Sequence, residues 1–481
     1  MNPDTWRRPA LTRLLDPSAA ATVRPSYVLL MNFMAAWMTA FMTTSINVAL
    51  PSIQTEFRLN AFALGWLPLG YMLASAAFLL PLGRIGDQYG RRLLFLTGLA
   101  VFGMSCVGPA FVHSYAPLMV LRLAQGVGAA LMFSTSVAMV TLAYPPHRRG
   151  WAMGISVSAA YLGQTTGPIL GGMIVHNVGW RSLFLVAGCF ALFNLCLDLS
   201  LLRRAEWREE RPERFDRTGS LVYAAALTLF LAGLSWLPVP WGIALTGLGF
   251  VGLLFFGWWE SRVASPVLPL RLFATNRTLT FSGLTALISY SSVWGMTFLM
   301  SLYLQFVRRL NPQTAGLVLI AGVALQCLAS PIGGRLSDYI QPRWVASLGM
   351  ALCTVGLFLL SLLGWQTPYW YIITALCLLG LGYALFSGPN QSAIMGSVER
   401  RYLGFASAAI STLRTVGQAT SIALATLLMA LIVGRQDIQP QDYPAVLTAV
   451  RLIFGLFTGL CAVGIVTSLA RGIVPVRAPE R

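Results

Sequence analysis

The segment PLGRIGDQYGRR, residues 81–92, places four charged side chains between two long apolar runs. On membrane-insertion scales, a charged residue at the centre of a spanning helix costs roughly 2.5–3.5 kcal/mol. The segment therefore fits a very short hairpin at a membrane surface, with Arg91 and Arg92 facing water and lipid headgroups. That interpretation does not explain why the carboxylate of Asp87 stands among arginines.

The composition indicates a polytopic membrane protein. Of 481 residues, 56% are hydrophobic and only 10% are charged, whereas about 25% of residues are charged in a soluble domain. The net charge is +17, and every basic residue is arginine. Because the arginines lie in short loops, the positive-inside rule explains them, and we expect no nucleic-acid partner. The seven cysteines form no CxxC or His/Cys cluster, so we predict neither disulfides nor a metal site.

Fourteen apolar segments are long enough, or nearly so, for a helix to cross a bilayer. We therefore predict an all-α polytopic protein with fourteen transmembrane helices. The predicted spans are residues 27–50, 61–83, 93–113, 116–143, 151–175, 181–202, 218–237, 240–259, 278–306, 312–334, 343–365, 369–396, 404–434 and 448–470.

Arginines are concentrated in the loops on one side of these spans, which places that side in the cytoplasm. Both termini are then cytoplasmic, as an even number of spans requires. Residues 1–26 contain four arginines but no apolar core, so we expect no cleavable signal peptide. The prediction is a multi-pass protein of the inner membrane. Its charged loop at 201–219 is expected to be a solvated linker rather than an interfacial helix.

A weaker copy of the opening segment occurs in the second half of the chain. GRIGDQYGRR at 83–92 is matched by GRLSDYIQPR at 334–343, and both follow an apolar span. Repeated halves about a central path are typical of transporters. The expected parts are a cytoplasmic segment 1–26, a six-helix bundle 27–203, a loop with an inserted two-helix hairpin 204–277, a second six-helix bundle 278–472 and a cytoplasmic tail 473–481.

Asp87 gives the opening segment a candidate function. A carboxylate that faces the positive N-terminal end of a helix is stabilised by roughly 0.3–1 kcal/mol, and by more when it is partly buried. Neighbouring glycines would let that helix approach closely. Such a contact would hold the cytoplasmic side shut in one state and break in another. The predicted gating loop comprises Gly83, Arg84, Gly86, Asp87, Gly90, Arg91 and Arg92.

Charged residues inside the spans are rare, and each suggests a function by default. Arg122 lies well inside the fourth span, with Gln125 one turn later; it is either satisfied by Gln125 and backbone carbonyls or used in coupling. Arg414, in the thirteenth span, is close enough to the cytoplasmic edge for its side chain to snorkel. Asp198 is the clearest carboxylate within a span, and we expect it to pair with the adjacent arginines at 203–204.

These motifs resemble those of the major facilitator superfamily. PLGRIGDQYGRR resembles the family's loop signature, and the likeness extends over residues 27–470. Further segments resemble the fourteen-helix drug:proton antiporter branch, namely NVALPSI at 47–53, RLAQGVGAA at 122–130, GQTTGPILGG at 163–172, LYLQ at 302–305 and LRTVGQA at 413–419. The resemblance implies two six-helix bundles around a central cavity and transport by alternating access. It also implies that a proton gradient drives transport without a cofactor, and that Arg122 takes part in proton transfer.

The segment at 163–172 has a physical pattern of its own. Gly163, Gly167 and Gly171 recur every fourth residue and share one helix face. Pro168 removes a backbone donor and bends the helix. Ordinary packing of small residues explains the pattern, and the resemblance adds that this face, including Gly172, seals the fifth helix against the opposite half.

One position departs from the family pattern. The resembling antiporters carry an aspartate in the first span where this chain has Met42. The alternative to a proton-coupled exporter is therefore an uncoupled facilitator, or an exporter of anionic or lipid-like molecules on the same fold. Two arginines without a central acid also favour an anionic or amphipathic substrate. The candidate cavity residues are Trp37, Met42, Asn47, Tyr71, Gln164, Tyr290, Trp294, Gln326, Asn390, Arg414 and Gln418.

Other classes of protein fit less well. A membrane enzyme would need a His/Asp or paired-carboxylate cluster at a membrane edge, and an ATP-driven pump would need a GxxxxGK[ST] loop; the sequence has neither. We therefore expect a small-molecule transporter that is not an enzyme, surrounded by the lipid bilayer and monomeric.

Overall fold

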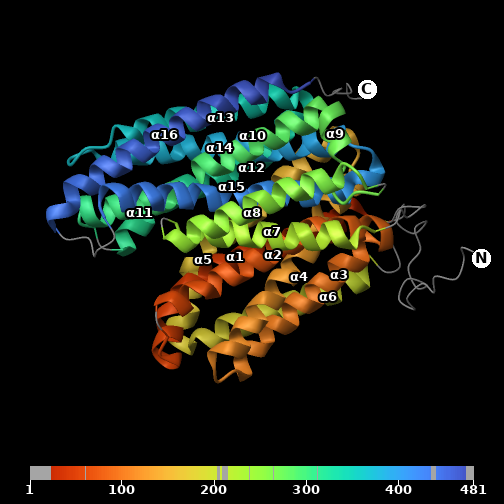
Figure 1. Cartoon of the computed structure of the whole chain (residues 1–481), viewed down its shortest axis with the longest axis horizontal. Helices are drawn as coiled ribbons and strands as arrows, with labels where there is room; N and C mark the ends of the chain where they lie inside the picture. Colours follow the sequence, from red (N-terminus) through yellow and green to blue (C-terminus); the bar gives the residue numbers. More distant parts are fainter. Residues whose placement is uncertain are drawn as a thin grey trace, which may run out of the picture.

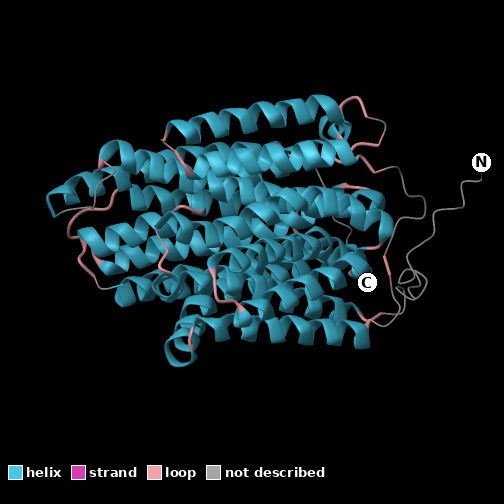
Figure 2. Cartoon of the chain, turned by 60° about the horizontal axis from the view of Figure 1, so that its bottom comes forward, coloured by secondary structure: helices cyan, strands magenta, loops and turns pink. Residues whose placement is uncertain are grey.

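The computed structural model describes residues 23–59, 61–202, 206–207, 215–237, 239–263, 265–310, 312–434 and 440–472. Throughout these ranges the chain is helical, with short connections and no strand (Figure 2). The helices are α1 (Pro25–Phe57), α2 (Ala61–Tyr89), α3 (Arg91–Val107), α4 (Tyr115–Ala143), α5 (Arg149–Val178), α6 (Trp180–Leu201), α7 (Arg217–Ser235), α8 (Pro240–Glu260), α9 (Leu270–Thr275), α10 (Arg277–Val293), α11 (Met296–Leu302), α12 (Pro312–Tyr339), α13 (Pro342–Ser361), α14 (Tyr369–Ser397), α15 (Leu403–Ile432) and α16 (Tyr443–Ala470).

Each predicted span falls on helical structure. Among the described residues, 13 helices are long and apolar enough to cross a membrane. The fourteenth is α5, which has 30 residues and is less apolar because glycine, serine and threonine line it. The predicted span 278–306 is not one continuous helix, because the chain bends after α10 and ends in a π-helical turn at Tyr303–Val307. The structure thus confirms an all-α polytopic membrane protein.

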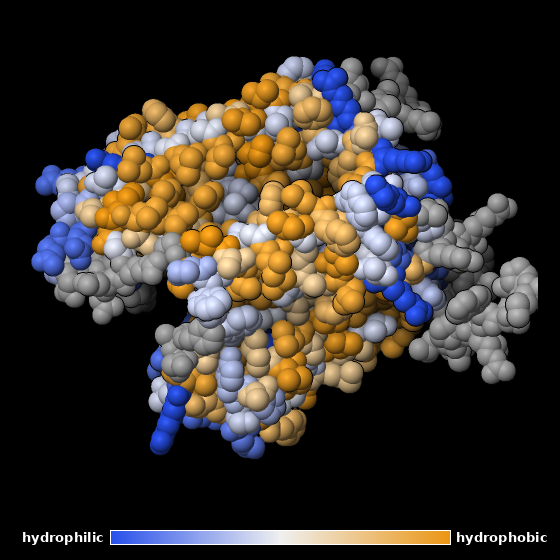
Figure 3. Space-filling model, viewed as in Figure 1, coloured by the Kyte–Doolittle hydropathy of each residue, from blue (hydrophilic) through white to orange (hydrophobic). Residues whose placement is uncertain are grey.

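The helices form two halves that face each other across the middle of the molecule (Figure 1). Helices α1–α6 pack together in one half and α10–α16 in the other, and the halves meet through α2 with α15 and α5 with α12. We call the end at which α1 begins and α16 ends the proximal end, and the opposite one the distal end. The surface is hollowed between the halves at the distal end (Figure 3). The halves are therefore in contact proximally and separated distally.

The inserted hairpin lies across the seam between the halves. Helices α7 and α8 pack tightly on each other, and α7 rests on both α2 and α15. The buried Tyr223 of α7 donates a hydrogen bond to the Ala76 carbonyl of α2 over 3.2 Å, and its hydroxyl lies 3.2 Å from the Thr412 hydroxyl of α15. Most of α8 faces outward with large apolar side chains. The hairpin therefore bridges both halves on its inner side and presents an apolar face to the surroundings.

Candidate gating and substrate sites

Asp87 lies at the proximal end of α2 and reaches across to the opposite half. Its carboxylate accepts hydrogen bonds from the backbone N–H groups of Gly404, over 2.8 Å, and Phe405, over 3.1 Å. Both belong to the first turn of α15, whose unpaired N–H groups and dipole favour an anion. Arg91 donates to the same carboxylate over 2.9 and 2.6 Å and to the Arg400 carbonyl over 2.9 Å. The predicted contact of Asp87 with a helix N-terminus is confirmed, while its role in gating remains a prediction.

Glycines make this contact possible, as the sequence predicted. A Cβ atom on Gly83 would lie 2.8 Å from the Gly404 carbonyl oxygen, and one on Gly404 would lie 2.4 Å from the Asp87 carboxylate. Gly86 is equally crowded by Thr135 at 2.8 Å. No side chain larger than hydrogen fits at Gly83 or Gly404 without separating α2 from α15.

The second copy of the motif makes the reciprocal contact. Asp338, at the proximal end of α12, accepts hydrogen bonds from the N–H groups of Gly150 over 2.6 Å and Trp151 over 2.9 Å, in the first turn of α5. Gly334 and Gly150 approach so closely that a Cβ on either would lie 2.1–2.2 Å from the other's carbonyl oxygen. We call the Asp87–α15 and Asp338–α5 contacts the two clasps. Asp338 was not among the predicted site residues, although the repeat at 334–343 was its signal.

The arginines of the opening segment are not solvated, so that expectation is wrong. Arg91 is 3% exposed and Arg92 is 0% exposed. Arg92 pairs with the buried Asp198 of α6, with 2.7 Å between Nε and Oδ1. The predicted partners at 203–204 lie outside the described residues. The ion pair allows Arg92 and Asp198 to be buried together, because either ion alone would carry an uncompensated desolvation cost.

Glu206 caps the start of α3. Its buried carboxylate accepts hydrogen bonds from the N–H groups of Arg92 and Leu93, each over 2.9 Å, and of Trp207 over 2.7 Å. Gly90, with φ at 130°, lies directly against this carboxylate. Burial raises the pKa of Glu206 to about 6. The beginning of the charged loop is therefore docked on the gating segment, which contradicts the expectation of a solvated linker at this point.

The glycine face of α5 packs within its own half. Cβ atoms on Gly163, Gly167 and Gly171 would collide with Trp37, Thr44 and Ser45 of α1, respectively. Gly172 has Val48 of α1 at an ordinary contact distance of 3.7 Å, and Pro168 lies inside the helix. The expectation that this face seals against the opposite half is wrong. A glycine at every fourth position identifies a closely packed helix face, but it does not identify the helix that packs on that face. Instead, Gly150 and Gly154 of α5 meet α12.

Arg122 and Gln125 are brought together inside the first half. The Arg122 guanidinium donates to the Leu67 carbonyl over 3.0 Å and to Gln125 Oε1 over 2.6 Å. It also lies 4.9 Å from the ring centroid of Tyr71. Gln125 in turn donates to the Ser105 carbonyl over 3.0 Å. These neutral partners satisfy the hydrogen-bonding needs of the guanidinium without a carboxylate. The expectation that Gln125 and a backbone carbonyl bind Arg122 is therefore confirmed, and its role in coupling stays a prediction.

A cluster of tyrosines joins the halves near the centre. Tyr161 of α5 and Tyr290 of α10 both meet Tyr383 of α14 edge to face, with ring centroids 6.0 and 5.7 Å apart. Arg414 of α15 is half-buried and lies 5.0 Å from the ring centroid of Phe133 in α4. Tyr290 and Arg414 were predicted, whereas Tyr161 and Tyr383 were missed because a tyrosine in an apolar span carries no distinctive pattern.

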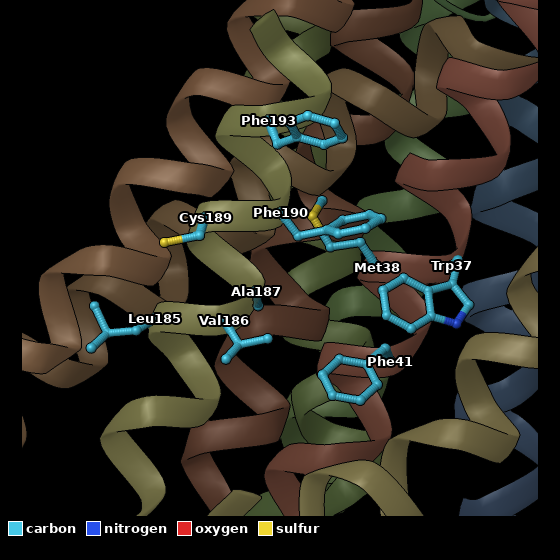
Figure 4. A pocket seen from close by; sticks show the side chains of 9 residues that line it. All are labelled: Trp37, Met38, Phe41, Leu185, Val186, Ala187, Cys189, Phe190 and Phe193. Carbon is cyan, nitrogen blue, oxygen red and sulfur yellow. The ribbon is translucent and has the colours of Figure 1, made fainter. Parts of the chain in front are cut away.

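Other predicted cavity residues lie elsewhere. Trp37 belongs to an apolar groove between α1 and α6, of about 450 Å³, where it packs on Phe41 and Phe190 (Figure 4). Met42 is buried in the core of the first half, Asn47 is exposed, and Asn390 donates to the Ser282 carbonyl over 3.2 Å. The partly buried residues are Gln164, Trp294, Gln326 and Gln418. Trp37 therefore lines the groove between α1 and α6 and Met42 is buried in the core, and a role for either residue in substrate binding stays a prediction.

Comparisons with known proteins agree with the fold. The model of the Major Facilitator Superfamily matches residues 33–422. The chain is 32% identical over 386 residues to the multidrug resistance protein Stp of Mycobacterium tuberculosis (strain CDC 1551 / Oshkosh), covering 79% of this chain and 71% of that protein. It is 28% identical over 438 residues to the tetracenomycin C resistance and export protein of Streptomyces glaucescens, covering 89% and 80%.

Two further comparisons add a different transporter and a solved structure. The riboflavin transporter RibZ of Clostridioides difficile (strain 630) is 27% identical over 399 residues, covering 82% of this chain and 86% of that protein. The crystal structure of the human organic anion transporter MFSD10 superposes with a TM-score of 0.70 at 16% identity, covering 92% of this chain and 99% of that one. At this identity the structural likeness shows the fold alone.

Proposed function

Because the chain belongs to the Major Facilitator Superfamily, and is thus a membrane transporter rather than an enzyme, we propose that it exports amphipathic small molecules by alternating access, coupled to the proton gradient. The observation that carries this proposal is the pair of reciprocal clasps. Each clasp joins a carboxylate of one half to a helix N-terminus of the other, and both lie at the proximal end. A device repeated in both halves is suited to hold one end shut while the other is open.

The positive-inside rule places the proximal end in the cytoplasm. The arginine-rich connections and both clasps then lie on the inner side of the inner membrane, and the hollow at the distal end faces outward (Figure 3). In this reading the structure is in the outward-facing state from which an exporter releases its substrate. Rocking of the halves would break both clasps and expose the centre to the cytoplasm.

Proton coupling would run through groups at the inner side. The buried carboxylates that the structure describes within the spans are those of Asp87, Asp198, Glu260 and Asp338, and all lie at the proximal ends of their helices. Arg122 remains the proposed coupling residue; it is buried within the first half, seven positions after the start of α4 at Tyr115. The second candidate function is an uncoupled facilitator, or an exporter of anions, and it is favoured by Met42 in place of a first-span acid.

The names of the relatives support export over uptake. Both the tetracenomycin C protein and the cephamycin export protein CmcT of Amycolatopsis lactamdurans, which is 30% identical over 403 residues, are described as exporters. By this analogy the substrate is a small organic molecule that reaches the cytoplasmic side or the inner leaflet. That the protein works as a monomer is part of the proposal and comes from the sequence alone.

The deciding experiment measures proton flux in proteoliposomes with an imposed pH gradient and clamped voltage. An amphipathic dye is added, and the protein is compared with Arg122→Ala, Asp87→Asn and the control Arg401→Gln, an exposed residue of the same inner surface. Dye-triggered proton movement that Arg122→Ala abolishes and Arg401→Gln retains supports antiport. Dye movement without protons supports the facilitator. Movement of neither contradicts both.

A further inference from the structure

The inserted hairpin brings two carboxylates together at its proximal end. Asp216 immediately precedes α7, and Glu260 ends α8. A Cβ atom on Gly219 would lie 2.4 Å from Asp216 Oδ2 and also 2.4 Å from Glu260 Oε1, so these two oxygen atoms are at most twice that distance apart. Glu260 is 2% exposed, whereas Asp216 is partly exposed. One carboxylate of the pair is therefore buried, and the other is accessible at the proximal end.

The hydrogen bonds of the two carboxylates are unequal. Asp216 caps α7 by accepting from the Gly219 N–H over 2.9 Å, and it also accepts from the Trp259 indole N–H over 2.9 Å. Glu260 Oε2 accepts from the Leu268 N–H over 3.0 Å, but Glu260 Oε1 has no hydrogen-bond partner in the described part of the chain. The donors and the start of α7 stabilise Asp216 as an anion. Glu260 Oε1 is left as the atom that would carry a proton.

The charges around Glu260 also favour a proton on this atom. Two anions at this separation repel each other, and burial strengthens the repulsion because it removes screening water. The charged groups that face Glu260 are Asp216 of α7 and Arg84 of α2, whereas Arg262 in the following linker lies 4.3 Å from the ring centroid of Trp258. A proton on Glu260 Oε1 would be donated in a hydrogen bond to Asp216 and would leave one negative charge in the pair.

Glu260 is connected to the clasp at Asp87 by a chain of contacts. Its bond to Leu268 holds the linker that runs from the hairpin to α9, and α9 begins two residues later. Phe273 of α9 packs edge to face on Phe405 of α15, with ring centroids 6.0 Å apart. Phe405 donates one of the two backbone N–H groups that bind Asp87. A change at Glu260 can therefore reach the first turn of α15 through packed neighbours.

We propose that Asp216 and Glu260 bind one proton between them while the inner side is closed, and that release of this proton to cytoplasmic water favours opening of the inner side. The proton leaves Glu260 Oε1, and no other covalent bond changes. The two anions then repel each other, which loosens the linker and removes the support of α9 from the clasp. This inference rests on the proposed alternating access and adds regulation by cytoplasmic pH to it.

The sign of the pH dependence distinguishes this pair from the clasps. Because the closed state holds the shared proton more tightly than the open state, raising the pH favours the open state. Protonation of the clasp carboxylates Asp87 and Asp338 would weaken their bonds to N–H groups, so for them lowering the pH favours opening.

The test measures the distance between spin labels at Tyr89 and Tyr339, two exposed residues that end α2 and α12 at the proximal end, in the purified full-length protein. Raising the pH from about 5 to about 9 should increase the ratio of long to short distances by at least about tenfold, the factor for a difference of one pKa unit between the two states. Glu260→Gln supplies an amide donor that cannot be deprotonated and should keep the short distance at both pH values. The control Glu399→Gln changes an exposed carboxylate at the same end and should respond as the wild type does.

Infrared difference spectra over the same pH range locate the proton independently. The loss of the C=O band of protonated carboxyl groups should be larger in the wild type than in Glu260→Gln by one carboxyl group. A wild-type distance that does not depend on pH, or a pH response of Glu260→Gln equal to that of the wild type, overturns the inference. A response that occurs in sodium buffer and not in choline buffer assigns the pair to a metal cation and also overturns it.

The variant Asp87→Asn, measured in the same way, separates this inference from the proposed function. If Asp87→Asn lengthens the distance while pH has no effect on the wild type, the clasps gate the inner side and the regulatory proton fails. If the infrared band assigns a proton to Glu260 while neither pH nor Asp87→Asn changes the distance, gating by the clasps fails and the proton site stands without it.

Discussion

Replacement of Asp87 by asparagine should open the inner side of the protein. The ion pair of Asp87 with Arg91 lies within one half, so the contacts of the Asp87 carboxylate that cross to the other half are those with α15. These are two hydrogen bonds from Gly404 and Phe405 to an anion at a helix N-terminus. Only contacts that differ between two states shift their populations. We therefore expect Asp87→Asn to shift the free-energy difference between the states closed and open at the inner side by about 2–4 kcal/mol. This corresponds to a change of roughly 30- to 800-fold in the ratio of the two states.

The assay uses a cysteine that is buried only when the inner side is closed. Ser407 is 0% exposed at the contact of α15 with α4, where its hydroxyl donates to the Phe133 carbonyl over 2.9 Å. In a background whose seven cysteines are replaced, Ser407→Cys should react with a water-soluble maleimide at least about tenfold faster when Asp87→Asn is present. The control Glu399→Gln breaks an exposed pair with Arg401 at the same end and should leave the rate unchanged. An unchanged rate in Asp87→Asn would refute the reasoning.

Three further changes probe the parts around the clasps. Asp198→Asn leaves Arg92 buried without its counter-ion and should destabilise the protein by about 3–5 kcal/mol, measured as a lower Tm in detergent; a Tm within a degree of wild type would contradict the pair. Glu206 has its pKa raised by burial to about 6, so the folded state binds this proton more tightly than the unfolded state does. Its contribution to stability should therefore fall by on the order of 2 kcal/mol as pH rises from below 4.5 to above 6, and Tm compared with Glu206→Gln across that range tests the sign. Tyr223→Phe removes a hydrogen bond that bridges α7 to α2 and α15, and should raise the labelling rate of Ser407→Cys by about fivefold; a rate at or below that of wild type would show that the hairpin does not hold the seam.

The sequence predicted the spans and the Asp87 contact because their signals are local. Apolar runs of spanning length need no tertiary information, and a carboxylate flanked by glycines after such a run already suggests a close helix N-terminus. The repeat at 334–343 carried the same local signal for the second clasp, the contact of Asp338 with α5. The signals for these features lie in neighbouring residues, although Asp87 and its partner Gly404 are 317 positions apart.

The failures concern partners that no local sequence pattern identifies. Arg92 and Asp198 are separated by 106 positions, and nothing in either segment indicates that α3 and α6 pack together. Glu206 looks solvated because it stands in a charged loop, yet it is buried as a cap for α3. The glycine period of α5 identified a packed face but could not tell whether α1 or the opposite half covers it.

The direct test of alternating access is a pair of distances measured by spin labels at the two ends of the molecule. Tyr89 and Tyr339 end α2 and α12 at the proximal end and are 50% and 61% exposed, while Val178 and Leu431 lie at the distal end and are 73% and 68% exposed. On introducing Asp87→Asn, the Tyr89–Tyr339 distance should lengthen while the Val178–Leu431 distance shortens. If both distances change in the same direction, or neither changes, the clasps do not control alternating access.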